Sequence, residues 1–383
     1  MGADSCNIEY LIGRQAELNQ VSQVLAIDGD LLIAGVPGSG RRTLVRYAAE
    51  RMEARVIEID CLRATDSDRF LHLFAEGLLQ AFKSTTERSL IQNWSTQQPI
   101  RLEHTANGTQ LVWQKTSTDK WTVLEALLGL PQTLAEWLIC RIVIVFQNFP
   151  HIRSWDRSQQ WENYLRQEIQ RQPQVSYAFI ATVAESWVLQ SELQVVLLGP
   201  LKSEDLQPWL EKVMAAQGLT FQPQALTLFL DYIQGNFGDA IALMRRLWQN
   251  HQLTKIAEVN CFSTSLTSNS SHSVLSPFSS SDLIQPEQVH SSTLALVEDL
   301  ARTFEALLML LPPSQVRLLE SLALDPTDSP HSREYIQKHH LSRGGGLQGA
   351  IASLQQKGLV YGAEYGYRIT MPLLAFWLKH RLA

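Results

Sequence analysis

The sequence predicts an α/β fold with a parallel sheet, followed by a small helical segment and a separate C-terminal domain. The sheet is predicted by five short apolar runs, at residues 30–35, 55–60, 141–146, 177–182 and 194–198. Most of these runs are separated by segments with helical apolar spacing, which is typical of a parallel sheet covered on both faces. From residue 202 to about 253 the apolar spacing is helical, and a serine-rich stretch then precedes the last domain.

The composition is that of a folded protein with several domains. The 383 residues suggest two or three domains, and 45% hydrophobic against 18% charged residues excludes wholesale disorder. A net charge of −6 and a pI of about 5.9 argue against general coating of nucleic acid. No apolar run reaches the roughly 18–20 residues of a membrane helix, and the N-terminus lacks a signal-peptide pattern. Four widely spaced cysteines predict neither a disulfide framework nor a zinc site, so we expect a reduced, cytoplasmic protein outside the membrane.

Helices and strands alternate along the first 200 residues. The first three predicted strands are each preceded or followed by a segment with helical periodicity, at 14–26, 41–52, 70–82 and 123–138. The polar stretch 84–122 contains Asn107-Gly108, a dipeptide typical of hairpin turns, so we expect a hairpin there.

Four segments are expected along the whole chain. Three helices at 203–217, 222–233 and 239–249 predict a helical lid, and a tract rich in serine, threonine and asparagine follows. Such a tract buries little apolar surface, which predicts a flexible linker. Three further helices, at 316–324, 333–339 and 347–357, precede a hairpin within 358–370, which is the pattern of a winged helix. The predicted domains are 1–200 (α/β domain), 201–255 (lid), 256–295 (linker) and 296–383 (winged helix).

A glycine-rich loop between a strand and a helix is the main functional motif. The segment GVPGSGRRT at 35–43 has the glycine spacing of the phosphate-binding P-loop, G-x-x-x-x-G-K-[ST]. Arg41 stands at the lysine position, Arg42 stands at the position of the Mg²⁺-binding hydroxyl, and Thr43 follows one residue later, turned by about 100° around the helix. In such a loop the backbone N–H groups and the helix N-terminus face the phosphates. The candidate nucleotide-binding residues are Gly35, Pro37, Gly38, Ser39, Gly40, Arg41, Arg42 and Thr43; the alternative is a glycine-rich turn without a ligand.

The strand at 141–146 ends on neutral amides instead of acids. Gln147 and Asn148 occupy the positions where a P-loop enzyme places the carboxylates that hold Mg²⁺ and activate water. No catalytic residue is therefore assigned, and the predicted site holds two arginines without an acid. We expect ATP or ADP to bind without Mg²⁺, if at all, and hydrolysis to be lost. The rival hypothesis is that Asp60 or Glu185, which lie near strand ends, restores the missing acid.

Several segments resemble the archaeal-type ATPases of the STAND branch, which are relatives of the AAA+ and origin-recognition ATPases. They are LIGRQAEL at 11–18, LLGLPQTLA at 127–135, LGPLKSED at 198–205, GNFGDA at 235–240 and ITMPLLAFW at 369–377. The resemblance covers most of the chain and implies a P-loop domain, a lid and a winged helix. It also implies that Arg14 lies near the adenine and that Arg245 or Arg246 senses the nucleotide, with surface exposure as the alternative for each. Met371 stands where the family usually has aspartate, and the catalytic positions depart too.

The predicted recognition helix of the winged helix, 346–357, carries little positive charge. Lys357 is its one cation, with Arg343 just before it, while Gln348 and Gln355 could contact bases. Residues 296–383 contain nine lysines and arginines against eight aspartates and glutamates. Proteins that bind duplex DNA usually bring several cations to the phosphates. A protein partner or self-association is therefore at least as well supported as DNA.

Three interpretations of function remain open. The first is a regulatory or scaffold protein built on a degenerate P-loop ATPase, in which nucleotide sets the lid position without being hydrolysed. The second is a working ATPase that uses Arg41 and displaced acids. The third is a winged-helix DNA-binding factor whose ATPase-like part mediates assembly.

Overall fold

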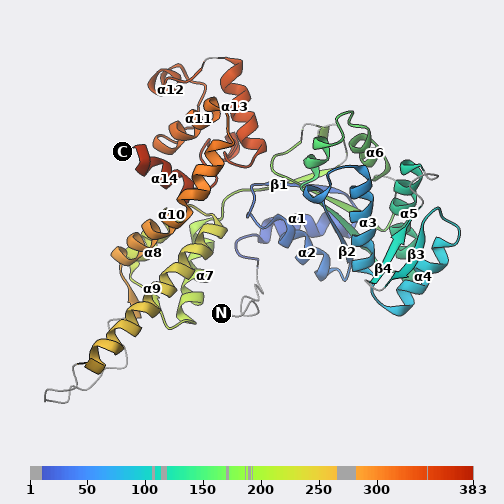
Figure 1. Ribbon diagram of the computed structural model, residues 1–383, viewed down its shortest axis with the longest axis horizontal. Coiled ribbons are helices and arrows are strands. Elements are labelled where there is room, and N and C mark those ends of the chain that lie inside the picture. Colours follow the sequence, from blue (N-terminus) through green and yellow to red (C-terminus); the bar gives the residue numbers. More distant parts are fainter. Residues whose placement is uncertain are drawn as a thin grey trace. The chain divides into compact units, whose positions relative to one another are not determined.

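The computed structural model describes residues 11–105, 108–113, 119–169, 172–185, 187–188, 191, 193–264, 282–342 and 344–382. These residues form two compact units (Figure 1). The first unit contains the residues up to Gly35 and Gly40–Leu198. The second unit contains Gly199–Ala383 and also the loop residues Val36–Ser39. In the described part of the chain, every helix is too short or too polar to cross a bilayer.

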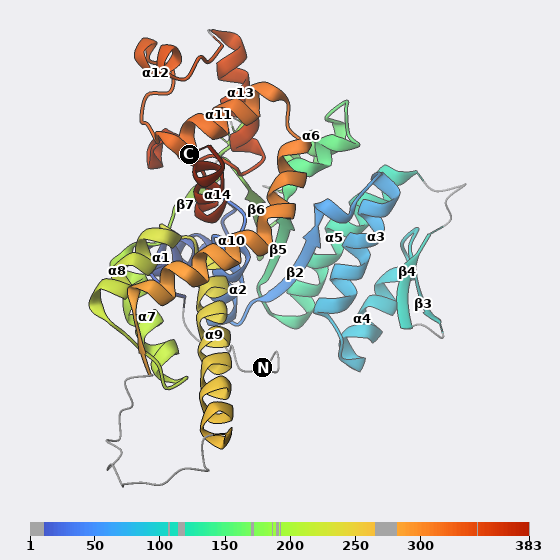
Figure 2. The same ribbon diagram turned by 60° about the vertical axis from the view of Figure 1, so that its left-hand side comes forward.

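A five-stranded parallel sheet forms the centre of the first unit (Figure 2). All five predicted strands are present, and each begins and ends within two residues of its expected bounds. The order across the sheet is β2-β5-β6-β1-β7, so β1 lies between strands that come much later in the chain. The strands are β1 (Leu31–Gly35), β2 (Arg55–Asp60), β5 (Ile142–Gln147), β6 (Val175–Ala181) and β7 (Gln194–Leu198).

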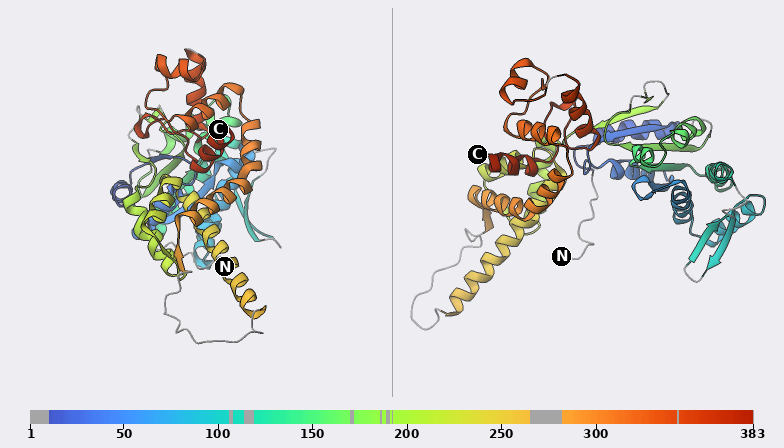
Figure 3. Two further views of the ribbon diagram at one scale, coloured as in Figure 1. Left: turned by 90° about the vertical axis from the view of Figure 1, so that its left-hand side faces the viewer. Right: turned by 45° about the horizontal axis from the view of Figure 1, so that its top comes forward.

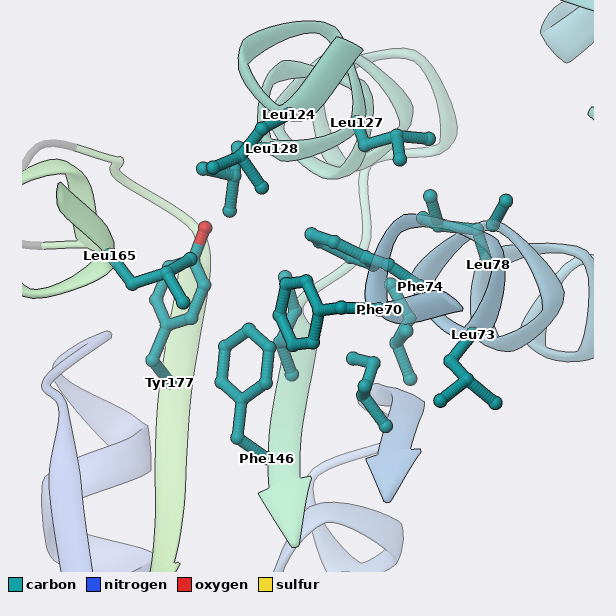
Figure 4. Close-up of a cluster of buried hydrophobic side chains, with 14 of the residues drawn as sticks. Phe70, Leu73, Phe74, Leu78, Leu124, Leu127, Leu128, Phe146, Leu165 and Tyr177 are labelled. Carbon is teal, nitrogen blue, oxygen red and sulfur yellow. The ribbon is translucent and has the colours of Figure 1, made fainter. Parts of the chain in front are cut away.

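Helices cover both faces of this sheet, as the alternation along the strands requires. Leu31 and Ile33 point to α1 (Gln15–Ala26) and α2 (Arg41–Arg51). Leu32 and Ala34 belong to the core on the opposite face, which is covered by α3 (Ser67–Ala81), α5 (Lys120–Leu138) and α6 (Gln160–Ile169). Figure 4 shows the centre of that core, where the rings of Phe70, Phe74 and Phe146 pack between α3 and the sheet. Successive residues of a strand point to opposite faces, which is why continuous apolar runs predicted these strands.

The polar stretch 84–122 holds a helix as well as the predicted hairpin. The hairpin consists of β3 (Arg101–Thr105) and β4 (Gly108–Val112), paired antiparallel; Asn107 lies outside the described residues. The additional helix is α4 (Thr85–Ser95), which the sequence analysis missed. It begins with a capping box, in which the Ser84 hydroxyl accepts from the Glu87 N–H and the Glu87 carboxylate accepts from the Ser84 N–H. This cap stabilises a helix whose exposed face is polar.

The second unit begins with the lid helices. These are α7 (Ser203–Ala215), α8 (Pro223–Ile233) and α9 (Phe237–Thr264), and α10 (Pro286–Met309) follows after β9 (Leu283–Ile284), which pairs with β8 (Thr220–Phe221). Figure 3 shows the end of α9, in yellow, extending beyond the other helices of this unit.

The predicted linker over 256–295 is wrong at both ends. Residues 256–264 continue α9 and residues 286–295 begin α10, while 265–281 lie outside the described residues. At the C-terminal end of the predicted linker, the polar composition wrongly indicated a loop, because Ser292 and Thr293 are buried in a helix. Thr293 satisfies its hydroxyl by donating to the Val289 carbonyl at 2.8 Å within the helix, so polar residues here pack in a helix instead of forming a loop.

The winged helix contains the three predicted helices but only a rudimentary wing. The helices are α11 (Pro313–Leu324), α12 (Arg333–Lys338) and α13 (Gly345–Gln356), and α14 (Pro372–Leu382) ends the described chain. The predicted hairpin at 358–370 is reduced to isolated bridges, including Val360 with Ile369. Its tip instead forms a 3-10 turn at Ala363–Tyr365. The glycines that suggested a hairpin turn therefore flank a short helical turn.

The winged helix is joined to the lid helices by direct contacts, which corrects the expectation of a loose connection. The Asn236 side-chain amide donates to the Thr370 carbonyl at 3.0 Å, and the Leu373 N–H donates to the Asp239 carboxylate at 3.3 Å. These four residues are called the junction below. The segment that carries Asn236 and Asp239 and the segment that carries Thr370 and Leu373 both resemble the ATPase family, so two of its motifs contact each other here.

Candidate nucleotide-binding site

The glycine-rich loop leaves the carboxyl end of β1 and leads directly into α2. Gly38 and Gly40 have φ angles of +85° and +88°, in the left-handed region that favours glycine. A Cβ atom at either position would meet no atom within 4 Å, so backbone conformation and not crowding selects glycine. The Ser39 N–H donates to the Val36 carbonyl at 3.1 Å, which closes the turn before the helix. Pro37 and Gly38 are exposed, as a loop that receives a ligand requires.

Arg41, at the lysine position, is anchored at the end of β6. Its Nη1 donates to the Ala181 carbonyl at 2.7 Å. Burial lowers the pKa of Arg41 to about 10, so the guanidinium stays charged at neutral pH. The contact fixes the guanidinium between α2 and the carboxyl end of β6. The other N–H groups of the guanidinium remain to bind an anion.

Arg42 is paired with an acid that the sequence analysis did not consider. Its Nε donates to the Glu58 carboxylate at 2.9 Å, and its Nη2 contacts the second oxygen. The hydrogen bond with Glu58 raises the pKa of Arg42. The expectation of two arginines without an acid is therefore wrong, since Glu58 on β2 offsets the charge of Arg42. Thr43 is exposed on α2, where its hydroxyl is one position late.

The ends of β2 and β5 bring one carboxylate to the position of the missing acids. Asp60 lies opposite Gln147 in the sheet. Its Oδ1 accepts from the Asn148 side-chain amide at 3.0 Å and from the Leu62 N–H at 3.1 Å. Asn148 has a left-handed φ of +53°, a conformation that asparagine tolerates better than most residues. Asp60 thus lies beside the two positions where a P-loop enzyme has its acids, and it is already held by two donors.

Glu185, the other candidate acid, belongs to a separate buried ion network. Arg153 contacts Glu185 at 2.7 Å and Glu162 at 2.8 Å. Arg166 also contacts Glu162, and its guanidinium lies 4.1 Å from the ring centre of Trp187. This network occupies the Glu185 carboxylate. In the described residues, no three histidine, cysteine or acidic side chains come together as a metal site.

The remaining predicted arginines have different surroundings. Arg14 is only 6% exposed and pairs with Glu17 at 2.9 Å, so the alternative of a surface residue is wrong. Arg246 on α9 pairs with Asp299 of α10 at 2.6 Å, which engages it inside the second unit. Arg245 is exposed on α9.

Comparisons with known proteins support the fold. A Walker-type ATPase of Pyrococcus abyssi is similar to this chain with a TM-score of 0.63, at 14% sequence identity over 97% of each chain. The ORC2 protein of Aeropyrum pernix, solved as ADPNP–ADP complexes, has a TM-score of 0.52 at 12% identity, covering 97% of this chain and 96% of its own. Its ADP form gives 0.51 at 13% identity, covering 97% and 95%.

A family described as "probable winged helix domain" matches residues 302–380, and no curated protein matches the sequence. The chain therefore has the fold of AAA+-like P-loop ATPases with a C-terminal winged helix. At identities this low, the structural similarity establishes the fold alone, and any chemistry has to be argued from the residues of this chain.

Proposed function

We propose that this protein is a P-loop scaffold that binds ATP or ADP and does not hydrolyse it. The observation that carries the proposal is the contrast between an intact loop and neutral positions at the end of β5. Gly38 and Gly40 have the positive φ angles of a phosphate loop, while Gln147 and Asn148 supply neither a metal ligand of negative charge nor a base. Of the two acids near the loop, Glu58 is paired with Arg42, and Asp60 already accepts from Asn148 and Leu62.

In this proposal the phosphates are held by backbone N–H groups and by Arg41. The first N–H groups of α2 have no partner within the helix, and the N-cap Gly40 has no side chain to satisfy them. Arg41 adds a charge fixed by its bond to Ala181. Arg42 does not replace Mg²⁺, because its charge is offset by Glu58.

The output is proposed to be a contact between the winged helix and another protein. The exposed side of α13 includes Gly346, Gln348, Gly349 and Ala352, all uncharged. The Lys357 ammonium, the one cation of the predicted recognition helix, donates to the Gln315 side chain at 2.7 Å. Arg343 lies outside the described residues. A neutral face gives little counterion release on DNA, which favours a protein partner.

Calorimetry with ATP and ADP, in Mg²⁺ and then in EDTA, tests the proposal. We expect binding that survives EDTA and no phosphate release over hours. Arg41→Ala should weaken binding by about tenfold or more, as loss of a charge-assisted contact to phosphate does. Arg42→Ala is the matched control and should change affinity less than about twofold, because Glu58 holds that side chain. Strict dependence on Mg²⁺, or steady turnover, would overturn the proposal.

A second candidate, a slow ATPase, is favoured by the position of Asp60 beside Asn148. If Asp60 serves as the missing acid, the parent protein should release phosphate and Asp60→Asn should abolish that release. The restored variant Arg41→Lys, Arg42→Thr, Gln147→Asp separates the two candidates. Turnover that appears only in the restored variant supports the non-hydrolysing scaffold.

A further inference from the structure

A groove lies between α3 and the hairpin, within the first unit and outside the P-loop. Figures 1 and 2 both show β4 as the hairpin strand nearer to α3. The groove has a volume of about 380 Å³, and its floor is formed by Ala75, Leu79 and Leu111. We call it the α3–β4 groove.

The groove runs along the edge of β4 and not across one face of the hairpin. It is lined by four consecutive residues, Thr109–Val112. Side chains alternate along a strand, so a groove on one face would be lined by every second residue. The hairpin has two strands, and the described residues place no third strand beside β4. The backbone donors and acceptors on this edge are therefore available to an added strand.

The two ends of the groove differ in charge. At one end the ring of His72 stacks on Trp113, with ring centres 4.4 Å apart. At the other end stand Lys83, which is exposed, and Arg88 of α4. From His72 to Gln80 the helix rises about 12 Å, and four residues of β4 span about 13 Å, so the groove suits a peptide segment of three or four residues.

The cationic end contains a donor without a partner. The Nη2 of Arg88 donates to the Leu79 carbonyl at 2.5 Å, while its Nη1 is buried and has no hydrogen-bond partner among the described residues. Glu76, the acid that lines the groove, pairs with Arg69 at 3.2 Å and with Arg63 at 3.5 Å. Burial lowers the pKa of Arg88. A buried guanidinium N–H without a partner is unfavourable and would be satisfied by an incoming anion.

We propose that the α3–β4 groove binds the C-terminal segment of an extended peptide, which adds to β4 as a third strand and places its terminal carboxylate at Lys83 and Arg88. The charge asymmetry determines the direction. β4 runs from Thr109 to Val112, and Val112 directly precedes Trp113, whose ring stacks on His72, so Thr109 lies toward the cationic end. A strand antiparallel to β4 therefore ends at the two cations, whereas a parallel strand would bring its amino end there. Strand addition supplies affinity through backbone bonds, and the apolar floor accepts alternate side chains.

The experiment uses the full chain, immobilised, and a display library of random hexapeptides with free C-terminal carboxylates. We expect enrichment of peptides with alternating apolar residues, and at least a tenfold loss of affinity when the enriched peptide carries a C-terminal amide. Hydrogen exchange of the complex should show new protection of β4 amides. No enriched peptide, or equal binding of the amidated form, would overturn the proposal.

Two variants keep the result interpretable. Lys83→Glu changes an exposed residue and should reduce peptide affinity about tenfold without altering the fold, and Arg88→Gln should reduce it further. Arg101→Gln, on the exposed side of β3, is the matched control and should bind as the parent does. If inorganic phosphate displaces the peptide fully and β4 gains no protection, the site binds only a small anion and the proposal fails.

Discussion

The P-loop region and the junction of the second unit both resemble the ATPase family, yet their side chains have different partners. In the P-loop region, Arg41 donates to the distant Ala181 carbonyl, but Arg42 contacts another side chain, Glu58, at a solvent-exposed position. In the junction, Asn236 and Asp239 contact backbone groups of residues 134 positions away.

The difference shows which motif residues serve the fold and which remain available for a ligand. Side-chain pairs at the surface contribute little to stability, so they can be exchanged while the sheet persists. Backbone contacts between distant segments fix the geometry of a unit, and a substitution there disturbs two segments together. We therefore expect junction variants to lose stability and Arg42 variants to keep nearly all of it.

The largest effect is expected from Gly235→Ala. Gly235 has a φ of +79°, and a Cβ there would overlap the Leu201 carbonyl oxygen and lie 2.8 Å from the Leu201 nitrogen. These are backbone atoms that cannot rotate away, so we expect a loss of about 3–4 kcal/mol in the free energy of unfolding. Urea denaturation followed by tryptophan fluorescence measures it.

Gly218→Ala is the matched control. Gly218 has a similar φ of +74°, but a Cβ there would meet no atom within 4 Å. This variant should lose only about 1 kcal/mol in the free energy of unfolding, because alanine is strained in the left-handed region. Equal losses in the two variants would show that strain alone, and not the close contact with Leu201, determines the effect.

An intermediate effect is expected from Asp239→Asn, and it should depend on pH. Burial raises the pKa of Asp239 from 3.8 to about 6. An acid whose folded pKa is raised contributes stability that is complete below about pH 4 and lost as pH rises through 6. The parent should therefore lose about 2–3 kcal/mol relative to Asp239→Asn between pH 4 and pH 8. Denaturation midpoints at both pH values test this, and parallel curves would contradict a raised pKa.

The sequence predicted the elements of both regions better than their contacts. Buried parallel strands are continuous apolar runs, so β1 and β5 were recognisable without tertiary information. The contact between Asp60 and Asn148 depends on which strands are neighbours, and no local pattern states that β2 lies beside β5. The pairing of Arg42 with Glu58 depends in the same way on how α2 crosses β2.

Two misses had local signals of their own. The capping box of Ser84 and Glu87 indicates helix α4, in a polar stretch where only a hairpin was expected. The start of α10 was marked by Gln285 and Pro286, which precede a helix whose serine and threonine side chains are buried. Capping chemistry is thus the better indicator where polar residues dominate.

The smallest effect is expected from Arg42→Ala, and it tests the other side of the comparison. The Arg42 side chain is 54% exposed, and exposed ion pairs contribute about 0.2–1 kcal/mol. Arg46, whose Nε lies 3.9 Å from the Glu58 carboxylate, can take over part of the pairing and reduce the loss further. A double-mutant cycle of Arg42→Ala with Glu58→Gln should give a coupling energy below about 1 kcal/mol, with Arg51→Ala on the same helix as control. A coupling above about 2 kcal/mol would mean that this pair helps to hold α2 on the sheet, and the P-loop region would then resemble the junction in what its charged residues do.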